Sequence, residues 1–226
     1  MSQTPKSHIF YQPFTFALLL CIFAFLSHVA LGILDHYLTH TFSILALGLL
    51  LFTLKKHSNT LFLITLTFIF IIALGYTPSG LLYGPASIGI IASVYETNFS
   101  ETLGFFRAMP LSIYFFTFFY LLLFLILLFI NRHITPSKNN KSAYYLIYFI
   151  LLAFALYQPI SNVMKNTDKE KEFSLADFFK ASDFYPVSFL ANTLKVNNTY
   201  LTQRALLNDA LTKTPEWQIL SVEPKY

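Results

Sequence analysis

The chain has 226 residues, of which 55% are hydrophobic, 18% aromatic and 12% charged. This composition and a mean hydropathy of +0.57 exclude an ordinary soluble domain and indicate that much of the chain is surrounded by lipid. The formal net charge of +4 does not indicate nucleic-acid binding, because the longest basic run is the pair Lys55-Lys56 and a surface that follows phosphates needs several basic residues.

Five apolar runs along the chain are long enough, or nearly so, to cross a membrane as helices. A helix rises about 1.5 Å per residue, so about 20 residues span the roughly 30 Å hydrocarbon core. We expect spans at residues 14–34, 41–54, 61–76, 111–130 and 143–157. The second reaches full length only with Tyr37 and Leu38, and the third and fifth are expected to end at the breakers 77–80 and Pro159.

Basic residues gather at alternate ends of these runs. One side holds six of them, and the opposite short loops hold only Arg107. The six are Lys6, Lys55, Lys56, Arg132, Lys138 and Lys141. Because basic residues mark the cytoplasmic side, the amino terminus is expected in the cytoplasm. Five crossings then place the carboxy-terminal end outside, where residues 160–226 hold a balanced eight Lys or Arg and eight Asp or Glu.

Two stretches outside the spans show helical periodicity. Between residues 87 and 106, apolar side chains recur every three or four positions. This predicts an amphipathic helix, or two helices joined at Asn98, that lies at the outer face of the membrane which the spans cross. In the tail, Ser174 with Asp177 is typical of a helix start, and residues 200–211 again have helical spacing, which predicts short surface helices.

The expected organisation is therefore an all-α membrane protein with about five transmembrane helices. Residues 1–163 would form the transmembrane domain, with an interfacial loop helix at 86–107. Residues 164–226 would form a short helical segment outside the membrane.

Residues 95–101 concentrate polar chemistry within the amphipathic stretch. They include two carboxylates and three small polar side chains, and Thr97 and Glu101, four positions apart, would share one face of a helix. An acidic side chain in this place would meet the ammonium of a phospholipid headgroup. The alternative is a capping box, in which Asn98 is the N-cap of a second helix and Glu101 is its N3 residue.

Other candidates for chemistry are weaker. His36 and His40 stand four apart beside Asp35, the spacing of a metal pair if the turn is helical, although histidines in such a turn are more often solvated. Cys21 is the only cysteine, which excludes an intrachain disulfide. We find no nucleophile beside a base and no ionisable residue to carry protons or ions within a span, which argues against a catalytic centre and against a transporter.

Three segments carry a resemblance to a known family: YETNFSETLGFF at 95–106, DFYPVSFLANTL at 183–194 and PEWQILSVEPKY at 215–226. Together with the five spans, they resemble the amino-terminal membrane domain of the bacterial phosphoethanolamine transferases. The branch resembled acts on lipopolysaccharide core or other periplasmic glycans. The resemblance implies that Thr97 and Glu101 contact the donor headgroup, with Ser93 standing where relatives of the lipid A branch have an asparagine.

The resemblance also implies partners and a location. In that family a zinc-activated threonine of a periplasmic domain takes phosphoethanolamine from phosphatidylethanolamine and passes it to an acceptor sugar. This chain would then be a multi-pass protein of the bacterial inner membrane, with a periplasmic carboxy-terminal end, that positions phosphatidylethanolamine. Zinc and the catalytic residues would belong to a domain expected beyond Tyr226, so residues 164–226 would be a linker and the chain alone an inactive, truncated or frameshifted fragment.

Two other functions remain open as alternatives. The first is a non-catalytic polytopic membrane protein that binds lipid or anchors a partner in the cell envelope. The second is a small-solute permease, which is weaker because the expected spans lack a polar lining.

Overall fold

The computed structural model describes residues 13–33, 37–133, 141–165 and 174–213, and these residues form helices and no strand. In chain order the helices are α1 Pro13–Ala30, α2 Tyr37–His57, α3 Asn59–Tyr83, α4 Ile88–Glu96, α5 Phe99–Ala108, α6 Leu111–Asn131, α7 Lys141–Lys165, α8 Leu175–Lys180 and α9 Tyr185–Lys213. Helices satisfy their backbone hydrogen bonds internally, which is the requirement that lipid imposes on a spanning segment. The expected all-α membrane class is confirmed.

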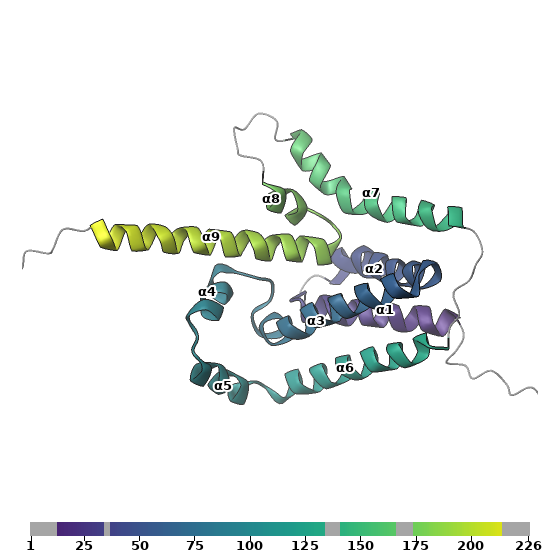
Figure 1. The fold of residues 1–226 in the computed structure, drawn as a ribbon, viewed down its shortest axis with the longest axis horizontal. Coiled ribbons are helices and arrows are strands. Elements are labelled where there is room, and N and C mark those ends of the chain that lie inside the picture. Colours follow the sequence, from purple (N-terminus) through teal and green to yellow (C-terminus); the bar gives the residue numbers. More distant parts are fainter. Residues whose placement is uncertain (1–12, 34–36, 134–140, 166–173, 214–226) are drawn as a thin grey trace, which may run out of the picture.

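Four of the described helices are long and apolar enough to cross a membrane: α1, α3, α6 and residues Tyr144–Lys165 of α7. The remaining expected span, α2, has 21 residues and ends in Lys55, Lys56 and His57. It packs against both α1 and α3 and lies alongside them in Figure 1. Its crossing of the membrane stays a prediction.

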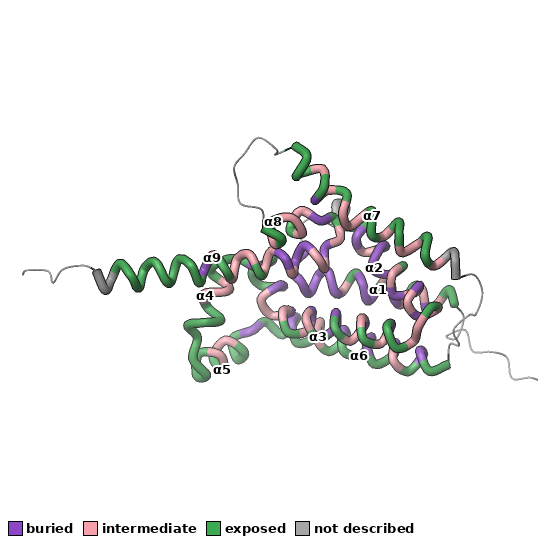
Figure 2. Tube along the Cα trace, turned by 45° about the horizontal axis from the view of Figure 1, so that its top comes forward, coloured by how far each residue is buried: buried purple, intermediate pink, exposed green. Residues whose placement is uncertain are grey.

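The core lies where α1, α2, α3 and α6 meet. Figure 2 shows the buried residues gathered along α1 and the helices beside it, whereas α5 and the far part of α9 are exposed. Tyr120 of α6 stacks on Phe23 of α1 with ring centroids 5.4 Å apart, and Phe70 of α3 stacks on Phe124 of α6 at 3.9 Å. These interdigitated rings fix the helices laterally, since van der Waals packing is a main source of helix association in lipid.

The predicted ends of the third and fifth spans, at residues 77–80 and at Pro159, were wrong, because Pro78 and Pro159 both lie inside helices. The helix α3 passes through Pro78 and continues to Tyr83, and α7 passes through Pro159 and continues to Lys165. A proline removes one helical hydrogen bond. In a membrane protein the backbone nevertheless stays helical, because unwinding would expose several more unsatisfied groups to lipid.

The segment after α7 is more helical than expected. Ser174 does precede α8, although its side chain forms no capping hydrogen bond. The expected short helix at 200–211 belongs instead to the 29-residue α9, which starts in the bundle at Tyr185 and extends beyond it (Figure 1). The first turns of α9 bury Tyr185 and Phe189 in the core cluster, and this packing explains why the helix starts so early.

Candidate functional site

The candidate site is the exposed pair of helices α4 and α5, which connects α3 to α6. Neither helix has a buried residue. Large apolar side chains are left in the open, with Val94 72% and Phe99 84% exposed. Both helices lie at the end of the bundle from which α9 extends (Figure 1). An amphipathic pair with uncovered apolar side chains at the end of a membrane bundle fits the interface between lipid and water.

The predicted joint at Asn98 is present, and it carries a capping box. The Asn98 side chain accepts a hydrogen bond from the Glu101 backbone N–H at 3.0 Å, and the Glu101 carboxylate accepts from the Asn98 backbone N–H at 3.4 Å. Glu101 also accepts from the Asn98 side-chain amide at 2.9 Å. The capping box, which was the alternative to a headgroup contact, is therefore present, and Glu101 caps α5 in addition to any ligand that it binds.

The expectation that Thr97 and Glu101 share one helical face was wrong. Thr97 is the C-cap that follows α4 and has extended backbone (ψ 130°), and Asn98 is also extended (ψ 171°), so no single helix contains both Thr97 and Glu101. The capping box nevertheless folds the Glu101 carboxylate back onto the residue that follows Thr97. Glu101 is thus tied to the joint that contains Thr97 by a cap and not by helical periodicity.

Ser93 lies one turn before Thr97, and its backbone carbonyl accepts from the Thr97 N–H at 2.9 Å. Its hydroxyl donates to the Gly89 carbonyl at 2.8 Å, so its oxygen remains able only to accept further hydrogen bonds. The three expected residues are therefore all exposed, Ser93 in the last turns of α4, Thr97 directly after it and Glu101 in the first turn of α5.

A set of contacts between α4 and α9, which we call the α4–α9 seam, was not foreseen from the sequence. It consists of Tyr95 and Glu96 of α4 with Asn197 and Tyr200 of α9. The rings of Tyr95 and Tyr200 stack at 5.2 Å, the Tyr95 hydroxyl donates to Asn197 Oδ1 at 3.1 Å, and the Tyr200 hydroxyl donates to Glu96 Oε1 at 3.1 Å. Desolvation and the Glu96 carboxylate raise the pKa of Tyr200, against an opposing effect of Arg204.

A buried polar cluster in the bundle was also missed. His28 of α1 is 1% exposed, which corrects the expectation that no span contains an ionisable residue. Its Nε2 lies 2.9 Å from Ser43 Oγ of α2, and the Tyr185 backbone N–H of α9 donates to the same oxygen at 2.8 Å. A serine beside a histidine is a pattern of nucleophilic catalysis. This pair is buried, and its hydrogen bonds join three helices.

The metal hypothesis gains no support from the described residues. They contain no group of three His, Cys, Asp or Glu side chains able to hold an ion. Asp35 and His36 lie outside the described residues, and His40 packs edge-on against the Tyr185 ring at 5.2 Å.

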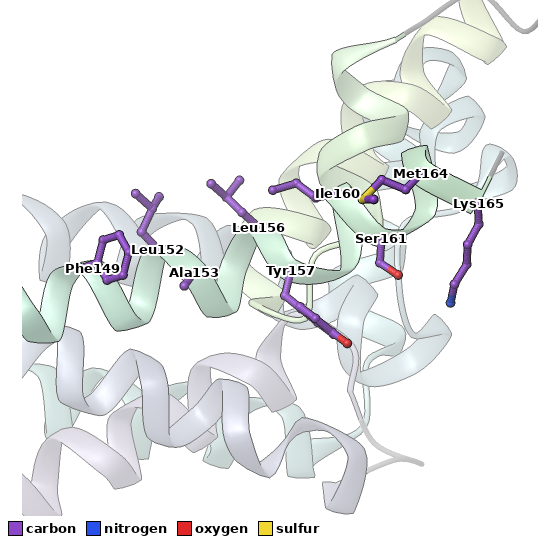
Figure 3. A pocket seen from close by; sticks show the side chains of 9 residues that line it. All are labelled: Phe149, Leu152, Ala153, Leu156, Tyr157, Ile160, Ser161, Met164 and Lys165. Carbon is purple, nitrogen blue, oxygen red and sulfur yellow. The ribbon is translucent and has the colours of Figure 1, made fainter. Parts of the chain in front are cut away.

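A shallow apolar hollow of about 660 Å³ lies on the carboxy-terminal part of α7. Figure 3 shows that its side chains all come from this one helix. They include Leu152, Leu156 and Ile160, with Lys165 at the end. On a helix apolar enough to span the membrane, such a face suits contact with lipid tails.

No family model, curated protein or solved structure matches the chain. The resemblance to the phosphoethanolamine transferases therefore stays a prediction.

Proposed function

We propose that this chain is the membrane domain of a phosphoethanolamine transferase of the bacterial inner membrane. Its task is to hold phosphatidylethanolamine so that phosphoethanolamine can be transferred to lipopolysaccharide or another envelope glycan. The observation that carries the proposal is the α4–α5 joint, where residues 93–101 include the exposed carboxylate of Glu101 and the exposed hydroxyls of Ser93 and Thr97, on helices with uncovered apolar side chains.

The chemistry of the joint matches an ethanolamine headgroup. An ammonium has three donors and no acceptor, so it needs acceptors such as a carboxylate and a hydroxyl oxygen. Each carboxylate oxygen of Glu101 accepts one hydrogen bond from Asn98 and can accept another. Ser93 is limited to accepting, as shown above, and Thr97 has a hydroxyl able to donate to a phosphate oxygen.

The transfer step would take place on a separate catalytic domain. In the resembled family that domain contributes zinc and a threonine nucleophile. The described residues hold no ligand set that fits zinc, so no step of the metal chemistry is assigned to them. Their part is to fix the donor at the membrane surface, which lowers the entropic cost of bringing two reactants together.

The variant Glu101→Gln tests the headgroup contact without removing the cap, because glutamine also serves at the N3 position of a capping box. We expect the wild-type chain to bind phosphatidylethanolamine in preference to phosphatidylcholine. The variant should lose about three- to tenfold of that preference, because it replaces a charged acceptor by a neutral one and weakens the hydrogen bond by about 1 kcal/mol. Native mass spectrometry of the purified protein with equal amounts of the two lipids measures the ratio.

The matched control is Asp183→Asn, an exposed carboxylate near the start of α9, which should leave the ratio unchanged. Equal binding of both lipids by the wild-type chain would remove the basis of the proposal. In a full-length transferase built on this membrane domain, Glu101→Gln should also reduce phosphoethanolamine transfer while membrane insertion stays intact. Mass spectrometry of the acceptor glycolipid measures the transfer, and an unchanged yield would refute a donor-site role for Glu101.

One observation favours the second candidate, a non-catalytic protein that anchors an envelope partner. The helix α9 carries exposed leucines, with Leu194 in its first half and Leu206 and Leu207 in its far part between 60% and 65% exposed. Such side chains are typical of a helix face that meets another surface. The transfer experiment separates the two candidates, because only the first requires Glu101.

A further inference from the structure

The position of the candidate headgroup site depends on a long-range attachment. The helix α4 buries none of its residues, and among the described helices it packs most extensively against α9. No comparable packing partner exists for α5 among the described helices. The α4 side of the joint is therefore held in place largely through α9, whereas the Tyr114 hydroxyl of α6 donates to the Phe106 carbonyl of α5.

The helix α9 is itself firmly fixed to the bundle. The Tyr185 hydroxyl donates to the Leu31 carbonyl at 2.9 Å, and Phe189 packs edge-on against Tyr76 of α3 at 4.9 Å. Asn192 then donates to the Ala86 carbonyl just before α4, at 3.0 Å. These contacts follow one another along α9, so the helix is a rigid support whose next contact is the α4–α9 seam.

Within the seam, the bond from Tyr200 to Glu96 is the contact nearest to the headgroup residues. Glu96 is the last residue of α4 and directly precedes Thr97. Tyr200 is only 6% exposed, so its hydroxyl has little access to water. A hydrogen bond to a carboxylate is charge-assisted and stronger than a neutral one, and a buried hydroxyl left without a partner is costly. The orientation of Glu96, and of the backbone that follows it, is therefore restrained by Tyr200.

We propose that Tyr200 and Glu96 are positioning residues, which hold Thr97 and Glu101 in the geometry that recognises an ethanolamine headgroup. The inference rests on the proposed function. Neither residue needs to touch the lipid; Tyr200 acts through Glu96, and Glu96 acts through the chain reversal at residues 97 and 98. This role is distinct from ring stacking alone, because stacking of Tyr95 on Tyr200 does not need the hydroxyl.

The test uses substitutions that separate the hydrogen bond from the ring. Tyr200→Phe keeps the stacked ring and removes the hydroxyl. Glu96→Leu removes the acceptor, whereas Glu96→Gln retains an acceptor oxygen and should restore the wild-type behaviour. Tyr83→Phe, on a tyrosine that is 63% exposed at the end of α3, is the matched control.

Two measurements are made on the full chain in lipid nanodiscs. The first is the preference for phosphatidylethanolamine over phosphatidylcholine, and the second is hydrogen exchange of the α4 backbone amides. We expect Tyr200→Phe and Glu96→Leu each to lower the preference about three- to tenfold and to speed exchange at the end of α4. Total binding of phosphatidylcholine should not change, because the residues that contact lipid tails are intact.

The double variant Tyr200→Phe/Glu96→Leu should be no worse than either single variant, since both remove the same bond. If Tyr200→Phe retains the preference for phosphatidylethanolamine, or if hydrogen exchange in α4 is unchanged, the positioning role is overturned and the proposed function is not. A wild-type chain without any preference for phosphatidylethanolamine would overturn the proposed function as well, and that result is visible before any variant is made.

Discussion

At the scale of single residues, Ser43 joins three helices through one hydroxyl. The Ala24 carbonyl can only accept, so the His28 Nδ1 atom, 2.7 Å away, carries a proton. In the neutral ring Nε2 is then an acceptor, and the Ser43 hydroxyl donates to it while accepting from the Tyr185 N–H. One side chain thus satisfies polar groups of α1 and α9 from its place on α2.

We predict that Ser43→Ala lowers the stability of the folded bundle by about 1–3 kcal/mol, the cost of buried polar groups left without partners. The substitution leaves almost no cavity, so the loss reports hydrogen bonding. Thermal unfolding in detergent, followed by circular dichroism, gives the comparison. Ser79→Ala, at a half-buried serine of α3, should unfold close to the wild-type temperature. Equal behaviour of the two variants would contradict a joining role for Ser43.

The residues of the candidate site were predictable to different degrees. The capping box at Asn98 and Glu101 follows from a spacing of three, which is a local property of the sequence. The bond between Tyr200 and Glu96 joins residues 104 positions apart, and no local pattern announces such a contact. The buried role of His28 was missed for the same reason, because its partner Ser43 lies on another helix.

At the scale of helices, α1 and α3 approach backbone to backbone. A Cβ built on Gly80 would lie 2.1 Å from the Ala30 carbonyl oxygen, and no flexible side chain is there to move aside. Close beside it, Gly32 and Gly84 have φ values of +98° and +77°, which glycine adopts without strain. Small residues at helix contacts allow close approach in membranes, and this contact joins the carboxy-terminal ends of α1 and α3.

We therefore predict that Gly80→Ala destabilises the bundle by about 1–3 kcal/mol, as overpacking of a filled contact does. The same change at Gly75 of the same helix meets no atom within 4 Å. Gly75→Ala should be neutral or slightly stabilising, since alanine has the higher helix propensity. Thermal unfolding of the two variants in detergent tests the prediction, and similar midpoints would show that the helices do not meet at Gly80.

Helix existence was easier to predict than helix length. The apolar runs identified α1, α3, α6 and α7 because lipid selects for continuous apolar sequence. The predicted carboxy-terminal ends of α3 and α7 were wrong, since the rule that a proline ends a helix is derived from chains in water. The length of α9 was not predictable, because its first turns are fixed by burial of Tyr185 and Phe189 among other helices.

At the scale of the whole molecule, Lys55, one of the basic residues from which the orientation is predicted, also joins helices. Lys55 is 2% exposed, and its ammonium donates to the Asn131 carbonyl at 2.9 Å and to Asn59 Oδ1 at 2.8 Å. Asn131 ends α6, so the cation stands at the negative end of a helix dipole. Lys55 therefore ties α2 to α6 at the end of the bundle opposite α4 and α5.

The orientation predicted from these basic residues places Phe99 in the periplasm and His133 in the cytoplasm. In a Cys21→Ala background, Phe99→Cys should react with a membrane-impermeant maleimide on intact spheroplasts. His133→Cys should react only after permeabilisation. Because α6 is the one helix between the two positions that is long and apolar enough to cross the membrane, opposite labelling requires a single crossing by that helix, and labelling from the same side would contradict it.

A third position tests whether α2 crosses the membrane. Phe14, at the start of α1, is 78% exposed, and α1, α2, α3 and α6 lie between it and His133. If all four helices cross, Phe14→Cys and His133→Cys are on the same side and both need permeabilisation. If α2 does not cross, the number of crossings becomes odd and Phe14→Cys is labelled from outside. The second result would place the amino terminus in the periplasm and leave four spans, because α2 would not cross.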